Sequence, residues 1–160
     1  MFRTTLAVAI IMIASSSVSR ADDASNWKAL EKVMTELQSS NDPSTFSYLV
    51  GRCTGLYVAI AKSSQSRAKS AEVGAQYLDF ASKLLRVLSL ANLQISGLTP
   101  SEENLNIQMT SDTETITTFA NGYIDRMNYN YTTTGHTLAE DPFMRQETMI
   151  CKTVAETVLQ

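Results

Sequence analysis

Residues 42–62 carry the pattern that decides the fold, and they read DPSTFSYLVGRCTGLYVAIAK. Asp42 is a favourable N-cap residue, and Pro43 suits the first position of a helix because proline lacks the N–H that would have no partner there. Apolar residues then repeat at helical spacing, with Cys53 at the centre of the stripe. The segment therefore predicts an amphipathic helix from Pro43 to near Lys62. The stripe consists of Phe46, Leu49, Val50, Cys53, Leu56, Tyr57 and Ile60.

The other two prolines stand in the same context. Thr99 precedes Pro100 and Asp141 precedes Pro142, so each pair offers an N-cap followed by a first helical residue. Glu102, three residues after Thr99, completes a capping-box pattern. No segment alternates apolar and polar residues over a strand length, so we expect no sheet. These starts predict an all-α fold, a small bundle of four to five helices.

Apolar spacing places the remaining helices at residues 26–38, at 67–92, from 100 onwards, and from 142 to the end of the chain. The apolar stripe of 67–92 is the widest, which predicts that this helix is central and the most buried. The polar stretch 106–115 leaves open whether the fourth helix is broken into two pieces. Residues 129–139 are rich in Thr and Tyr and contain Gly135, a composition that predicts a loop.

The first 21 residues have the pattern of an export signal. Arg3 precedes an uncharged apolar run of nine residues, Leu6–Ala14, and Ser19 and Ala21 supply the small residues of a cleavage site after Ala21. The run is too short for a membrane span, which needs about 20 residues. We therefore expect a periplasmic or secreted protein whose mature part, residues 22–160, is a single helical domain without a membrane anchor.

Cys53 and Cys151 are the only two cysteines. In an oxidising compartment such a pair is expected to form a disulfide, which would join the second helix to the last. Each cysteine lies about three turns into its helix, at 11 residues after Asp42 and 10 after Asp141. Neither belongs to a C-x-x-C motif, so the spacing does not indicate a redox-active pair. Two free thiols with a catalytic or intermolecular role are the alternative.

Charge and motifs argue against several function classes. The net charge is −3, and cleavage after Ala21 leaves 11 basic against 16 acidic residues, or −5, so a nucleic-acid partner is not expected. The single histidine, His136, falls in the expected loop without a nucleophile motif. The acidic residues between Glu102 and Glu114 lack the spacing of a calcium loop. We therefore expect no enzymatic activity, no metal and no cofactor.

Five residues are candidates for binding. Arg52 adjoins the apolar stripe, where it is able to anchor an anionic ligand or to pair with a carboxylate such as Asp79 or Asp125. The others are tyrosines, which enrich at recognition surfaces because they supply contact area at low entropy cost. The tyrosines are Tyr57, Tyr123, Tyr129 and Tyr131. For the last three of these, the alternative is a tyrosine-rich helix end with no partner.

Two further patterns have structural interpretations. Gly51, Gly55 and Ala59 lie four residues apart, a spacing that predicts close approach of another helix inside the bundle. Asn130, Tyr131 and Thr132 form a glycosylation triplet, a pattern that also arises by chance.

Two functions fit this pattern. The first is an exported protein that acts by binding another protein of the cell envelope or exterior, as an inhibitor, immunity protein or chaperone does. The alternative is a carrier of a small molecule or lipid, with an apolar cavity between the second, third and fourth helices and Arg52 or Arg86 at its mouth. A cavity larger than about 300 Å³ would favour the carrier, and a filled core with an exposed apolar groove would favour protein binding.

Overall fold

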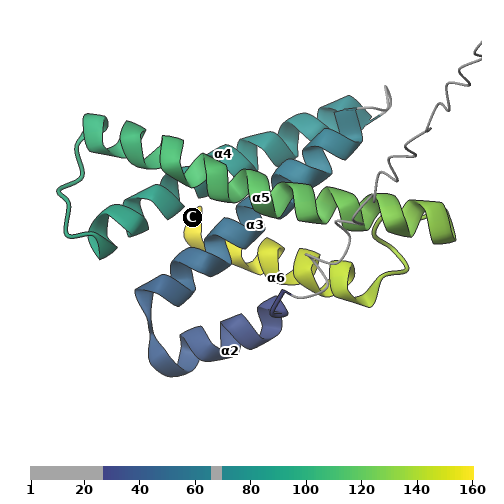
Figure 1. The fold of residues 1–160 in the computed structure, drawn as a ribbon, viewed down its shortest axis with the longest axis horizontal. Helices are drawn as coiled ribbons and strands as arrows, with labels where there is room; N and C mark the ends of the chain where they lie inside the picture. Colours follow the sequence, from purple (N-terminus) through teal and green to yellow (C-terminus); the bar gives the residue numbers. More distant parts are fainter. Residues whose placement is uncertain (1–26, 66–69) are drawn as a thin grey trace, which may run out of the picture.

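The computed structural model describes residues 27–65 and 70–160 and shows an all-α bundle across them, with no strand in these two ranges. The predicted fold class is therefore confirmed, whereas the predicted signal peptide, residues 1–21, lies outside the described residues. Figure 1 shows the five helices, which are α2 (Leu30–Ser40), α3 (Pro43–Gln65), α4 (Ala71–Ile95), α5 (Glu102–Thr134) and α6 (Pro142–Val158).

The helix α3 runs through the middle of the bundle, in contact with α2, α4, α5 and α6 (Figure 1). Every residue from Leu49 to Tyr57 is buried, so this helix has no solvent-facing side over more than two turns. The prediction that the 67–92 helix is central was wrong. One part of its wide apolar stripe, at Val73 and Phe80, faces solvent instead of the core.

The helix starts at Asp42 and Asp141 are confirmed. The Asp42 carboxylate accepts a hydrogen bond from the backbone N–H of Thr45 at 2.9 Å. The Asp141 carboxylate accepts from the backbone N–H of Phe143, also at 2.9 Å. Each proline occupies the first helical position after its cap, as its missing N–H favours.

The predicted start of α5 was wrong by two residues. The N-cap is Ser101, whose hydroxyl accepts from the backbone N–H of Asn104 at 3.1 Å. Thr99 instead accepts a hydrogen bond through its backbone carbonyl, from the side-chain amide of Asn104 at 2.9 Å. Pro100 therefore precedes the cap, because the serine that follows it is itself a favourable N-cap residue.

The helix α5 is unbroken between Glu102 and Thr134. The polar stretch 106–115 stays helical because its central carboxylate, Asp112, is buried against α4. There Asp112 accepts hydrogen bonds from Ser89 at 2.6 Å and Asn92 at 2.8 Å. A polar residue in this stretch therefore makes an interhelical contact and does not mark a break.

The loop predicted from Tyr129 is also wrong in its first part, because α5 continues to Thr134 and ends at Gly135 with a φ of 80°. Hydroxyl groups near this end donate to carbonyl groups about one turn back, for example Thr133 to Tyr129 at 2.9 Å. Threonines that suggested a loop thus satisfy the last carbonyls of a helix.

Close packing at the small residues of α3 is confirmed. A Cβ atom built on Gly55 would lie 2.5 Å from Cβ of Phe119 and 3.1 Å from the backbone N of Ala120. Only glycine allows α3 and α5 to approach this closely.

Candidate binding site

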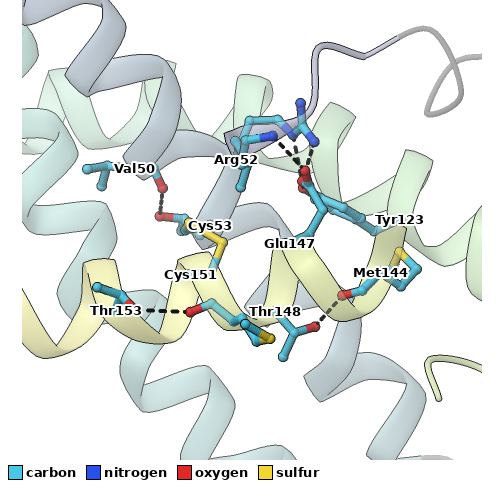
Figure 2. The surroundings of a disulfide bond; sticks show 12 residues. Val50, Arg52, Cys53, Tyr123, Met144, Glu147, Thr148, Cys151 and Thr153 are labelled. Atoms are coloured by element: carbon cyan, nitrogen blue, oxygen red, sulfur yellow. Dashed lines mark hydrogen bonds and ion pairs between the residues drawn. A yellow bond between two sulfur atoms is a disulfide. The ribbon is translucent and has the colours of Figure 1, made fainter. Parts of the chain in front are cut away.

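The predicted disulfide joins Cys53 of α3 to Cys151 of α6, with a Cα–Cα distance of 5.0 Å. Both cysteines are fully buried. Figure 2 shows the bond between the two helices, with Arg52 and Glu147 close beside it. The disulfide therefore fastens the last helix to the central one.

Arg52 is 0% exposed, and its guanidinium forms an ion pair with Glu147 of α6. The same guanidinium donates to the hydroxyl of Tyr123 and to that of Tyr48, each at 2.9 Å. The expected pairing of Arg52 with a carboxylate is confirmed, but the partner is neither Asp79 nor Asp125, and Arg52 does not stand at the mouth of a cavity. Its neighbour in the fold is a carboxylate far along the chain that no local pattern indicates.

The remaining contacts satisfy this buried cluster. Glu147 also accepts from the hydroxyl of Tyr123 and, at 2.9 Å, from the backbone N–H of Leu30. The ring of Trp27 lies over the guanidinium of Arg52, 4.3 Å from ring centroid to carbon, a favourable cation–π contact. Among the described residues no buried side-chain nitrogen or oxygen lacks a partner.

The surroundings of Arg52 and Tyr123 keep the first charged and the second neutral. Burial alone would lower the pKa of Arg52, but Tyr123 and Glu147 raise it above its ordinary value, so the guanidinium stays charged. Burial, together with Glu147, raises the pKa of Tyr123 well above 10, so its hydroxyl stays neutral and donates. A sealed and fully paired cluster of this kind holds helices together and offers no surface to a ligand.

The five candidate binding residues do not converge on one site. Arg52 and Tyr123 belong to the buried cluster. Tyr129 and Tyr131 are exposed on the last turns of α5. Tyr57 alone lies at the bottom of a hollow in the surface.

That hollow, which we call the α4–α6 groove, has a volume of about 830 Å³. It lies between α4 and α6 above Tyr57 of α3, and not between the second, third and fourth helices as the carrier hypothesis expected. Val73 and Phe80 on its α4 side remain 44% and 42% exposed. The lining residues are Tyr57, Val73, Gln76, Tyr77, Phe80, Thr148, Lys152, Ala155, Glu156, Leu159 and Gln160.

Aromatic rings dominate the inner part of the α4–α6 groove. The ring of Tyr57 contacts those of Tyr77 and Phe80 at centroid distances of 5.4 and 6.0 Å. Burial, with added effects of Tyr77 and Glu156, raises the pKa of Tyr57 to about 12. The hydroxyl of Tyr57 is therefore neutral at physiological pH, and this part of the groove offers apolar and aromatic contacts.

A second hollow of about 410 Å³ continues the first one and shares Phe80, Leu159 and Gln160 with it. Along α4 the two hollows together extend from Val73 to Leu90, a length of about 25 Å at 1.5 Å per residue. The second hollow is lined by Phe80, Lys83, Arg86, Val87, Leu90, Val158, Leu159 and Gln160.

Exposed charges stand along this surface. Lys152 pairs with Glu156 at 3.8 Å inside the α4–α6 groove. Lys83 and Arg86 line the second hollow, with their acidic partners outside its lining. Such exposed ion pairs contribute little to stability, so the cations can exchange partners at low cost.

Sequence reasoning did not identify this surface, although one signal was present. Val73, Tyr77 and Phe80 belong to the apolar stripe of the 67–92 segment, and the width of that stripe exceeded what one packing face needs. The excess was interpreted as depth of burial, whereas it reflects a second apolar face that is exposed.

Other candidates give no site. His136 is exposed and lies 3.5 Å from Glu140. The amide of Asn130 in α5, the glycosylation candidate, donates to the carboxylate of Asp141, the N-cap of α6, at 2.8 Å. Across 27–65 and 70–160 there is no group of three metal-binding side chains, and no helix has the length and apolarity of a bilayer span. Comparisons with protein-family models, curated proteins and solved structures gave no match.

Proposed function

We propose that this is an exported protein that acts by binding another protein of the cell envelope or exterior, and that the α4–α6 groove receives an amphipathic helix of that partner. The observation that carries the proposal is an apolar, aromatic groove open to solvent beside the buried apolar core. Contiguous exposed apolar surface of this kind is typical of interaction sites.

The shape of the surface favours a helix as the occupant. Val73, Gln76, Tyr77 and Phe80 lie at the i, i+3, i+4 and i+7 positions of α4, so they form one straight edge. The combined length of about 25 Å matches a partner helix of four to five turns. A helix laid along this edge would bury the exposed parts of Val73 and Phe80.

The charges that line the two hollows indicate which charges the partner helix should carry. The two hollows carry Lys83, Arg86 and Lys152 against one acidic residue, Glu156, on a chain whose net charge is −3. These basic side chains line the two hollows and are exposed, so they would face the flanks of a bound helix. We therefore expect a partner helix with an apolar face and acidic flanks.

Export is supported by two independent features. The first 21 residues have the composition of a cleavable signal, and a buried disulfide is typical of proteins that fold in an oxidising compartment. Both features support a periplasmic or secreted location.

A carrier of a small amphiphile is the second candidate. The volume of the α4–α6 groove, about 830 Å³, lies within the usual range for small-molecule sites. Arg86 lines the adjoining hollow, where it would face an anionic head group.

The test uses a photo-crosslinking amino acid in place of Tyr77, in the mature protein in its native compartment. A specific partner should crosslink there, and Phe80→Asp should weaken binding of that purified partner by about 30-fold or more, as for a central interface residue. Ile107→Asp is the matched control, since Ile107 is also a large exposed apolar residue but lies on α5, outside the groove. The double variant Lys83→Glu, Arg86→Glu should lower the affinity further.

Two results would contradict protein binding at the α4–α6 groove. A partner that binds Phe80→Asp as tightly as the wild type does not use the α4–α6 groove. A lipid or other amphiphile that copurifies with the wild type and is absent from Phe80→Asp, without any crosslinked protein, would favour the carrier.

A further inference from the structure

One wall of the α4–α6 groove is made entirely by α6 and the two residues after it. The opposite wall belongs to α4, and the floor is Tyr57 of α3. The groove therefore exists only while α6 is held at a fixed position over α3. The residues of the α6 wall are Thr148, Lys152, Ala155, Glu156, Leu159 and Gln160.

The disulfide lies at the centre of this arrangement. Cys151 sits in α6 between Thr148 and Lys152, and it is fully buried and does not line the groove. Its partner Cys53 lies one helical turn before Tyr57 on α3. The disulfide thus joins the part of α6 that forms one wall of the groove to the part of α3 that carries the floor residue Tyr57.

Polar contacts fasten only the first half of α6, through the ion pair of Glu147 with Arg52. Beyond Cys151 the described side chains of this helix make no hydrogen bond or ion pair to another helix, and the contacts with the core are apolar ones of Val154, Ala155 and the half-buried Val158. A terminal helical segment with few buried residues is prone to local opening when its cross-link is absent.

We propose that the Cys53–Cys151 disulfide controls the α4–α6 groove, so that the protein becomes competent to bind only after oxidation. This inference rests on the proposed function of the groove as a binding site. In the reduced chain the second half of α6 detaches and the groove loses one wall. A chain that still resides in a reducing cytosol is then inactive, and binding begins once export has allowed the bond to form.

The chemistry is thiol–disulfide exchange with an external disulfide, either of an oxidoreductase or of a small molecule. A thiolate of one cysteine attacks that disulfide and forms a mixed disulfide, and the second cysteine displaces it to give the Cys53–Cys151 bond. The two cysteines together lose two electrons and two protons, and the external disulfide becomes two thiols. Both sulfur atoms are buried in the folded protein, so the exchange takes place before α6 has closed over α3.

The experiment compares amide hydrogen exchange in the oxidised mature protein and in the double variant Cys53→Ala, Cys151→Ala. Protection of the amides of residues 152–158 should fall by about tenfold or more, because this segment can then open locally while α3 stays folded. Protection of Leu49–Tyr57 in α3 should fall much less. Leu93→Ala is the matched control, because Leu93 is a buried residue outside the main apolar cluster, and its loss should spare α6.

Two results would overturn the proposal. Unchanged protection of residues 152–158 would mean that α6 stays in place without the bond. An equal loss of protection in α3, α5 and α6 would mean that the bond holds the whole fold and not the groove. The wild type unfolded, refolded and kept in a dithiol reductant gives the same comparison without a substitution.

A binding measurement separates this proposal from the proposed function. The partner crosslinked at position 77 should bind the oxidised wild type and bind the double cysteine variant at least tenfold more weakly. Suppose that α6 opens in the double cysteine variant but Phe80→Asp leaves partner binding unchanged. The disulfide then controls the groove, but the partner does not bind there, so the proposed function is wrong. If Phe80→Asp abolishes binding but the double cysteine variant binds normally, the partner does bind in the groove, and the proposal that the disulfide controls the groove is wrong.

Discussion

Two interhelical contacts of this bundle differ in how they are filled. Between α3 and α5 the backbones touch at Gly55, where even a Cβ atom would lie only 2.5 Å from Phe119. Between α4 and α6 a hollow of about 830 Å³ remains, lined by the rings of Tyr77 and Phe80. Small residues thus close the first contact, and large exposed ones border the second.

The difference follows from where α6 is attached. Adjacent residues of α3, Arg52 and Cys53, bind residues one turn apart on α6, Glu147 and Cys151. Both attachments join α6 to α3, and neither joins it to α4. The side chains of α4 that face α6 therefore remain partly uncovered, which makes the open contact a consequence of the two buried attachments.

The largest expected effect comes from breaking the charged attachment. Glu147→Ala leaves the guanidinium of Arg52 charged and fully buried without its carboxylate. We expect the free energy of unfolding in urea to fall by about 3–5 kcal/mol, as for other buried pairs that lose one partner.

Two comparisons check this explanation. Glu140→Ala removes an exposed carboxylate near the same helix and should change stability by less than about 0.5 kcal/mol. The double variant Arg52→Met, Glu147→Leu should recover part of the loss, because no uncompensated charge remains. A loss for Glu147→Ala as small as that for Glu140→Ala would show that the pair does not hold α6.

A smaller effect is expected from a methyl group at the closed contact. Gly55→Ala gains helix propensity of up to about 1 kcal/mol but forces apart α3 and α5, so we expect a net destabilisation of about 1–3 kcal/mol. Gly51→Ala is the matched control, because its Cβ would lie 3.5 Å from the ring of Phe119, an ordinary contact distance. That variant should be more stable than the wild type by about 0.5–1 kcal/mol. Urea unfolding of the two variants side by side measures the difference, and equal effects would contradict the close approach at Gly55.

Local signals explain what could be predicted of this fold. The starts at Asp42 and Asp141 depend on a carboxylate and on N–H groups two or three residues later, all within one short segment. The disulfide required only that two cysteines share an oxidising compartment. Periodicity located the apolar faces of the helices for the same reason, since each face depends on residues within one helix.

Contacts between distant residues explain what could not be predicted. Asp112 is buried in α5 against Ser89 and Asn92 of α4, and nothing near Asp112 in the sequence shows that these two residues meet it. Arg52 is buried because of Glu147, 95 residues away. For the groove, the stripe containing Val73 and Phe80 was visible, but which neighbour covers a stripe depends on the tertiary arrangement of α6.

The smallest expected effect concerns the corner where α5 meets the start of α6, next to the fastened half of that helix. Asp141 accepts hydrogen bonds from Arg126 at 2.6 Å and from Asn130 at 2.8 Å, in addition to capping α6. Burial alone would raise the pKa of Asp141, but these donors lower it below its ordinary value of 3.8. The charged carboxylate therefore contributes stability at neutral pH, and this contribution is lost as the pH falls below 3.8 and through the lower pKa of the folded state.

Asp141→Asn keeps a favourable N-cap residue and removes only the charge, so it isolates this contribution. We expect the variant to be about 1 kcal/mol less stable than the wild type at pH 7, and the difference to shrink at about pH 3 and below. Urea unfolding at both pH values measures the two differences, with Glu140→Gln as a control that should show neither. A difference that stays constant between the two pH values would mean that the cap geometry, and not the charge, matters at this corner. Because α6 would then enter the bundle without electrostatic help from α5, its position over α3 would depend even more on Glu147 and on the disulfide.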